Sequence, residues 1–207
     1  QREFIWTKKM ATRKIARIAQ NSAVFFQCDI QTRFKDLIFK MDHVVHTAKL
    51  MANTAKVLDI PLVVSEQYRK VLGETLPEIQ ECYPENPIIK EKFCFTMLSD
   101  EIREEFKKIE KNQVVLYGIE GHVCVQQTCL DLLEQGYDVF LLTDGISSQR
   151  PLDRSTALQR MRDSGAVLTT SESLIFELMQ TSKHPLFKKM SPFVKEPRPE
   201  DQLSSLQ

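Results

Sequence analysis

Six short runs of apolar, mostly β-branched or aromatic residues constrain the fold of this chain more than any other feature. They begin near residues 23, 61, 87, 114, 139 and 166, and most are separated by segments long enough to form a helix. Strands that are apolar throughout need cover on both faces, and right-handed helical crossovers supply that cover. The pattern predicts a single-domain three-layer α/β/α sandwich with a mainly parallel, six-stranded, doubly wound sheet.

Apolar periodicity and capping residues place the helices between these runs. Ser99 has the side chain of a helix N-cap, and Gly136 suits a left-handed C-cap. A proline- and glycine-bearing stretch over 66–85 is typical of a loop with short turns. We therefore predict helices at 36–58, 99–111, 123–135, 152–164 and 171–179, and strands at 23–28, 61–64, 87–89, 114–118, 139–143 and 166–169.

The length of 207 residues fits one domain with flanking segments, which we place at 1–20, 21–180 and 181–207. Met10 opens a sequence that resembles a native start, so we interpret the nine residues before it as an added leader. From about Thr181 the chain is polar and contains four prolines. This composition predicts a tail that wraps the body or a neighbour, or is partly disordered.

Charge and cysteine content exclude several classes of protein. Lysine plus arginine and aspartate plus glutamate number 28 each, which disfavours nucleic acid as a partner. No apolar run reaches membrane-spanning length and no apolar segment stands near residue 1, so we expect neither a membrane partner nor a secretory signal. Five scattered cysteines without a CxxC pattern favour free thiols in a reduced compartment. We expect a cytoplasmic protein, with the basic residues Arg13, Lys14 and Arg17 leaving a mitochondrial address open.

Three side chains that can take part in acid–base or nucleophilic chemistry follow predicted strand ends: Asp29, Lys92 and Cys124. Doubly wound sheets bind their ligands at these ends. The macrodipole at a helix start stabilises a thiolate at Cys124, and the unpaired N–H groups there can hold an oxyanion. Taken singly, each residue has a simpler interpretation, as a packed cysteine, a turn aspartate or a solvated lysine. We interpret the remaining cysteines as packing residues: Cys28, Cys82, Cys94 and Cys129.

Together, these segments resemble the isochorismatase-like cysteine hydrolase family from about Ser22 to Leu178. The resemblance is carried by 23–31 with the following Phe34, by 91–97 around Lys92, by 118–128 around Cys124, and by the strand ends at 143–148 and 165–172. Residues 65–68 with 72–73 are similar to the animal isochorismatase-domain-containing branch. Departures from that branch stand at Arg69, Val71 and Gly121.

The resemblance implies an amidase-type hydrolase that works through a covalent thioester. Cys124 would be the nucleophile, Asp29 would take and return protons, and Lys92 would hold both in ionised form. The turn Ile119-Glu120-Gly121 would contain a cis Ile119–Glu120 bond and help to form the oxyanion site. The pocket wall would include Phe34, Gln67 and Tyr68.

No catalytic metal or other cofactor is expected. Residues 65–69 contain no histidine at the place where nicotinamidase-like members bind a metal, and we interpret His43 and His46 as a solvated or half-buried pair. The expected partners are a small-molecule substrate and further copies of the chain in a homo-oligomer. Two other functions stay open, namely an inactive binding or scaffolding protein that keeps the fold, and a nuclease-associated protein.

Overall fold

The computed structural model describes residues 15–199. Its strands form one sheet in the order β3-β2-β1-β4-β5-β6, and every neighbouring pair is parallel. The predicted fold class is therefore confirmed. The strands are β1 (Ala23–Cys28), β2 (Leu62–Gln67), β3 (Ile88–Lys92), β4 (Gln113–Ile119), β5 (Asp138–Ser147) and β6 (Val167–Thr169).

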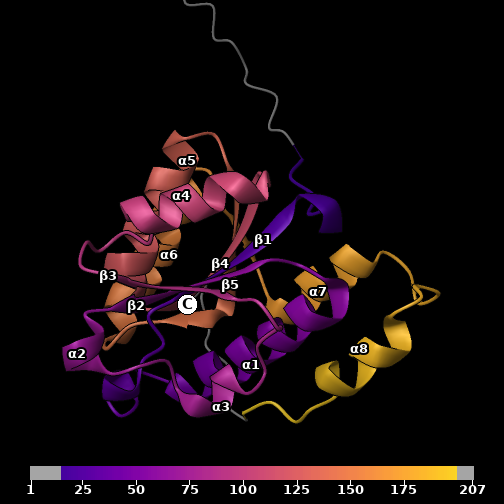
Figure 1. Cartoon of the computed structure of the whole chain (residues 1–207), viewed down its shortest axis with the longest axis horizontal. Helices are drawn as coiled ribbons and strands as arrows, with labels where there is room; N and C mark the ends of the chain where they lie inside the picture. Colours follow the sequence, from indigo (N-terminus) through magenta and orange to yellow (C-terminus); the bar gives the residue numbers. More distant parts are fainter. Residues whose placement is uncertain (1–14, 200–207) are drawn as a thin grey trace, which may run out of the picture.

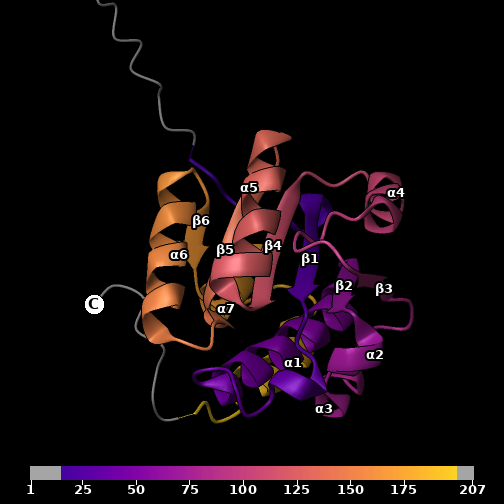
Figure 2. The ribbon, with the colours of Figure 1, turned by 90° about the vertical axis from the view of Figure 1, so that its left-hand side faces the viewer.

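Helices cover both faces of this sheet, as the two perpendicular views show (Figure 1 and Figure 2). One face carries α1 (Met41–Leu58), α7 (Ser171–Met179) and α8 (Phe187–Val194), and the other carries α4 (Asp100–Ile109), α5 (Gln126–Glu134) and α6 (Pro151–Asp163). The predicted cap of α4 is confirmed, because Oγ of Ser99 accepts a hydrogen bond from the Ile102 N–H. The loop between β2 and β3 contains two short helices, α2 (Arg69–Leu72) and α3 (Pro77–Gln80).

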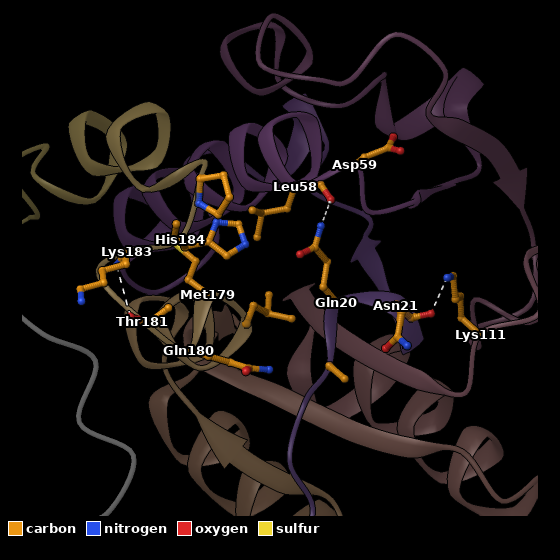
Figure 3. A pocket seen from close by; sticks show the side chains of 13 residues that line it. Gln20, Asn21, Leu58, Asp59, Lys111, Met179, Gln180, Thr181, Lys183 and His184 are labelled. Carbon is orange, nitrogen blue, oxygen red and sulfur yellow. Dashed lines mark hydrogen bonds between the residues drawn. The ribbon is translucent and has the colours of Figure 1, made fainter.

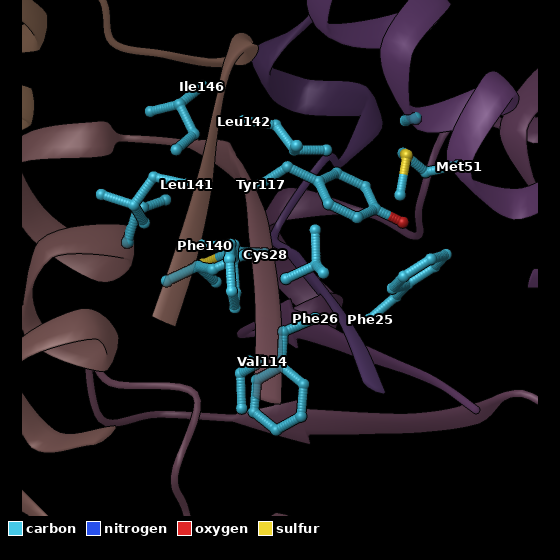
Figure 4. Close-up of a cluster of buried hydrophobic side chains, with 14 of the residues drawn as sticks. Phe25, Phe26, Cys28, Met51, Val114, Tyr117, Phe140, Leu141, Leu142 and Ile146 are labelled. Carbon is cyan, nitrogen blue, oxygen red and sulfur yellow. The ribbon is translucent and has the colours of Figure 1, made fainter. Parts of the chain in front are cut away.

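The core forms around the two central strands, β1 and β4, whose residues are all buried. Successive side chains of a strand point to opposite faces, so Phe25 lies on the side of Met51 from α1 while Phe26 points the other way (Figure 4). The ring of Phe26 packs against that of Phe106 on α4, with centroids 4.9 Å apart. Apolar residues on both faces of one strand thus join the two helical layers.

The first long helix begins later than its apolar pattern predicts. Its first residue is Met41 rather than Asp36, because Lys40 adopts a left-handed conformation with φ 52° and the chain before it forms a 3-10 turn, η2 (Thr32–Phe34). The helix ends as predicted at Leu58, where Asp59 is again left-handed. The turn holds Phe34 close to the end of β1.

The described parts of both flanking segments pack on the domain. The backbone N–H of Ile18 donates to the Glu177 carboxylate at 3.1 Å, and the Ile18 side chain is buried. The region predicted as a tail contains α8, whose Met190 is buried against α1 beside Thr54. The leader proposed for residues 1–9, the basic residues Arg13 and Lys14, and the last residues, 200–207, lie outside the described part.

The strand order reverses between β1 and β4, which are neighbours in the sheet although β2 and β3 separate them along the chain. Ligands of doubly wound proteins bind at the carboxyl ends of the strands at such a switch point. The end of β1 pairs with the end of β4 through Cys28 and Gly118. Gly118 has φ 140°, and a Cβ there would lie 2.2 Å from the Cys28 carbonyl oxygen, so only glycine fits at this crossing.

Candidate active site

Asp29 follows the last residue of β1 and directs its carboxylate into the sheet edge. Its left-handed conformation (φ 53°) turns the chain, and only 2% of the residue is exposed. One oxygen, Oδ1, accepts from Oγ of Ser65 at 2.7 Å, and the other, Oδ2, lies 2.8 Å from Nζ of Lys92. The structure thus brings the predicted aspartate and lysine into a buried ion pair.

Lys92 is the last residue of β3, which runs further than predicted. Its ammonium also donates to Oε1 of Gln67 at 2.6 Å and to the carbonyl oxygens of Cys94 and Phe95 at 3.2 and 3.1 Å. Burial by itself lowers the pKa of Lys92, but the neighbouring Cys28, Asp29 and Cys124 side chains outweigh burial and raise that pKa above its ordinary value. The lysine therefore keeps its charge inside the protein.

Cys124 lies in the turn that follows β4 and is 6% exposed. This segment is a single π-helical turn, η3 (Gly121–Val125), which continues into α5, so the regular helix starts later than the predicted residue 123. The prediction of a cis Ile119–Glu120 bond before the turn is wrong. No peptide bond in the described chain is cis, and the left-handed Glu120, with φ 52°, reverses the chain direction instead. Gly121 allows close packing, since a Cβ there would lie 2.9 Å from Ile146.

Cys28 lies beside Asp29, Lys92 and Cys124, which we call the active-site cluster. The interpretation of Cys28 as a packing residue missed this position. Its thiol donates to Oδ2 of Asp29 over 3.6 Å. Burial, followed by the contact with Cys124 and the charge of Asp29, raises the pKa of the Cys28 thiol well above its usual value. The only sequence signal for this role was its position directly before Asp29.

A cavity of about 340 Å³ opens over Cys124. Of the predicted wall residues, Phe34 and Gln67 line it, whereas Tyr68 turns away, is 45% exposed and packs against Phe93. Glu120 of the predicted oxyanion turn also lines it. Its wall further contains residues that sequence reasoning did not select, two of them from the loop after β5: Leu72, Phe95, His122, Val123, Gln149 and Arg150. The cavity is large enough for a small organic molecule.

A larger cavity, of about 650 Å³, lies at the opposite edge of the sheet (Figure 3). Its wall includes Asn21, which precedes β1, Asp59, which precedes β2, and His184 from the α7–α8 connection. Polar and apolar side chains line it together, and Gln20 and Lys111 donate to backbone carbonyl oxygens of the protein. This cavity is larger than the one over Cys124, but Asp29, Lys92 and Cys124 lie at the other edge.

The two histidines of α1 do not join the cluster. His43 is buried, and His46 lines a small cavity of about 80 Å³ together with Asp144. Across residues 15–199, no three histidine, cysteine or acidic side chains are grouped so that they could hold a metal ion. None of the helices in that range combines the length and apolar character that a bilayer crossing requires.

A fully parallel α/β/α sandwich with a polar cluster at its switch point defines a doubly wound α/β protein. The chain belongs to the isochorismatase family, whose isochorismatase domain it matches over residues 23–173. It is 42% identical over 190 residues to the secreted isochorismatase effector Isc1 of Phytophthora sojae, covering 90% of each chain. It is 40% identical over 196 residues to isochorismatase domain-containing protein 2 of Xenopus laevis, covering 94% of each.

A solved structure named MAR1 ribonuclease, from Caenorhabditis elegans, is similar with a TM-score of 0.87 and 38% identity. The similarity covers 93% of this chain and 99% of that one. The predicted family and its animal branch are thereby confirmed, and the chain has an isochorismatase-family hydrolase fold. The substrate, the roles of the three residues, self-association and the cellular compartment stay predictions.

Proposed function

We propose that the chain is a cysteine-dependent hydrolase of small amides or related acyl compounds. The observation that supports this most is the buried Lys92–Asp29 ion pair, 2.8 Å long, beside a Cys124 that lines a small cavity. A buried ion pair is a costly way to stabilise a fold, and such groups are often retained at sites of chemistry.

In the proposed mechanism, Asp29 is the final acceptor of the Cys124 proton. The thiolate attacks the substrate carbonyl, and backbone N–H groups of the Glu120–Cys124 turn hold the oxyanion. Asp29 returns the proton to the departing amine, which leaves a thioester on Cys124. Asp29 then takes a proton from water, the hydroxide attacks the thioester, and the acid product leaves while Cys124 regains its proton.

Lys92 keeps this site in its ionised form. Its fixed positive charge favours both the carboxylate of Asp29 and a thiolate at Cys124. Its bond to Gln67, which itself donates to the Phe93 carbonyl at 3.0 Å, anchors the ammonium to the cavity wall. Gln67 therefore supports the lysine as well as lining the pocket.

The test is the pH dependence of iodoacetamide labelling, with each cysteine read by mass spectrometry. In the wild-type chain, Cys124 should label faster at neutral pH than the more accessible Cys82 and Cys94. Asp29→Asn and Lys92→Ala should slow Cys124 alone, and a screen of small amides should show turnover that Cys124→Ala abolishes. Equal labelling of all cysteines, unchanged in both variants, would favour the alternative of an inactive binding protein with this fold.

A second candidate, a ribonuclease, is favoured by the names of similar structures, namely those from C. elegans, Leishmania major and Leishmania donovani. The same variants separate the two activities. RNA cleavage by the purified chain that is lost in Asp29→Asn and Cys124→Ala would support it. Cleavage that persists in both variants would point to a contaminating nuclease.

A further inference from the structure

The loop after β5 is bonded to the turn after β4 at the wall of the cavity. Nε2 of Gln149 donates to Oε1 of Glu120 at 2.7 Å, and Oγ of Ser148 lies 3.1 Å from Nδ1 of His122. The loop is itself fixed, since the Ser148 carbonyl oxygen accepts from the backbone N–H of Phe39 at 3.0 Å. Glu120, His122 and Gln149 all line the cavity, so these contacts lie where a substrate would bind.

Glu120 adopts a backbone conformation that its residue type disfavours. Its φ of 52° and ψ of 58° are left-handed, which costs free energy in a residue with a Cβ. Its Oε2 lies 3.4 Å from Nδ1 of His122 and accepts no hydrogen bond. Within the described part of the chain, the bond from Gln149 is therefore the one hydrogen bond that this carboxylate accepts.

The conformation of Glu120 decides where the N–H groups of the turn point. Because a peptide unit is planar, rotation about ψ of Glu120 swings the N–H of Gly121. N–H groups at the start of a helical turn have no partner within it, so they can hold an oxyanion. Cys124 belongs to the same turn. A change in the Glu120 backbone would therefore move these donors relative to the carbonyl that the thiolate attacks.

We propose that Gln149 is a positioning residue, whose bond to Glu120 holds the turn so that its backbone N–H groups face the carbonyl oxygen of the substrate. This inference rests on the proposed function, because it needs the oxyanion that attack by Cys124 creates. Gln149 forms no covalent bond and transfers no proton. It is exposed, so replacing it should leave the fold intact.

Two reagents that react with the same thiol separate oxyanion binding from access. 4-Nitrophenyl acetate is attacked at its carbonyl carbon: the sulfur–carbon bond forms as the C=O electron pair moves to oxygen, and 4-nitrophenolate then leaves. Iodoacetamide is attacked at a saturated carbon from which iodide leaves, so no oxyanion forms. Both rates are measured on the full chain, and the rates of Cys124→Ala are subtracted so that only reaction at Cys124 is compared.

Gln149→Met keeps the side-chain length but removes the donor. It should slow acylation of Cys124 about tenfold, less than the roughly 10²–10³-fold loss of a whole oxyanion donor, and leave alkylation within about twofold of wild type. Gln149→Glu sets a second carboxylate against Glu120 and should slow acylation further. Adding Glu120→Gln to it restores one donor and one acceptor and should recover most of the rate. The control is Gln135→Met, at an exposed glutamine just after α5, which should match wild type.

Unchanged acylation in Gln149→Met would overturn the proposal. Equal slowing of acylation and alkylation would also overturn it, because Gln149 would then control access to the thiol instead of the oxyanion. A double variant no faster than Gln149→Glu would show that the bond to Glu120 is not what matters. If wild-type Cys124 reacts with neither reagent faster than the exposed Cys94, the proposed function fails first, so the two failures are distinguishable.

Discussion

Nζ of Lys92 lies 2.8 Å from Oδ2 of Asp29, although β2 separates the strands that end at these two residues. The ammonium also donates a hydrogen bond to Gln67, the last residue of β2. Both charges are almost fully buried. The ion pair therefore links three adjacent strands at the edge where the candidate site lies.

Removing one partner of this pair should destabilise the chain strongly. Lys92→Met leaves the Asp29 carboxylate buried without its ammonium and should lower the free energy of unfolding by roughly 3–5 kcal/mol. The double variant with Asp29→Asn should recover part of this loss, because no unpaired charge remains. Urea unfolding measures both. Lys108→Met is the control, since its ion pair with Glu105 is solvent-exposed and should be worth less than about 1 kcal/mol.

The close crossing of β1 and β4 should make Gly118 intolerant of any side chain. A methyl group there would meet the Cys28 carbonyl at 2.2 Å in a backbone conformation with φ 140°. We expect Gly118→Ala to cost about 2–4 kcal/mol and to slow Cys124 labelling. Gly136→Ala, where φ is 83° and nothing lies within 4 Å, should cost only about 1 kcal/mol. Equal losses in thermal or urea unfolding would contradict the steric argument.

Alkaline pH should destabilise the chain through its buried thiols. Burial raises the pKa of Cys129 to about 12, whereas a free thiol titrates near about 8.5. Between these values the unfolded chain loses a proton that the folded chain keeps, so stability is complete below the lower value and falls as pH rises toward the upper one. Urea unfolding at several pH values should show a shallower decline for Cys129→Ala. Replacing the exposed Cys94 with alanine should leave the decline of the unfolding free energy with pH unchanged. If this decline is as steep in Cys129→Ala as in wild type, other groups cause it.

The wall of the 340 Å³ cavity should select labelling reagents by size. Cys124 should react with iodoacetamide much faster than with a bulky aromatic maleimide, when each rate is compared with that of exposed Cys94. Phe95→Ala removes part of the wall and should raise the maleimide rate at Cys124 several-fold. Tyr68→Ala, at an aromatic residue that faces away from the cavity, should have no effect. If both variants behave alike, the cavity does not control access.

The sequence by itself determined the layered parallel sheet, because runs such as 114–118 are apolar on both faces and can only be buried between helices. It also determined the neighbourhood of Asp29, Lys92 and Cys124, because the carboxyl ends of parallel strands share one edge. The cap at Ser99 and the end of α1 at Leu58 were equally predictable, because a cap depends on local hydrogen bonding and the apolar periodicity stops where the helix does.

Only the tertiary structure decided which side chains complete the site. Ser65 reaches the Asp29 carboxylate because of the register between β1 and β2. Cys28 is adjacent to Asp29 in the chain, but period-2 patterning cannot distinguish a packed cysteine from one that contacts a charge. His122 and Arg150 line the cavity because the turn after β4 meets the loop after β5, a contact between segments far apart in the chain. The left-handed Lys40 and Glu120 likewise depend on packing, since neither residue type favours that conformation by itself.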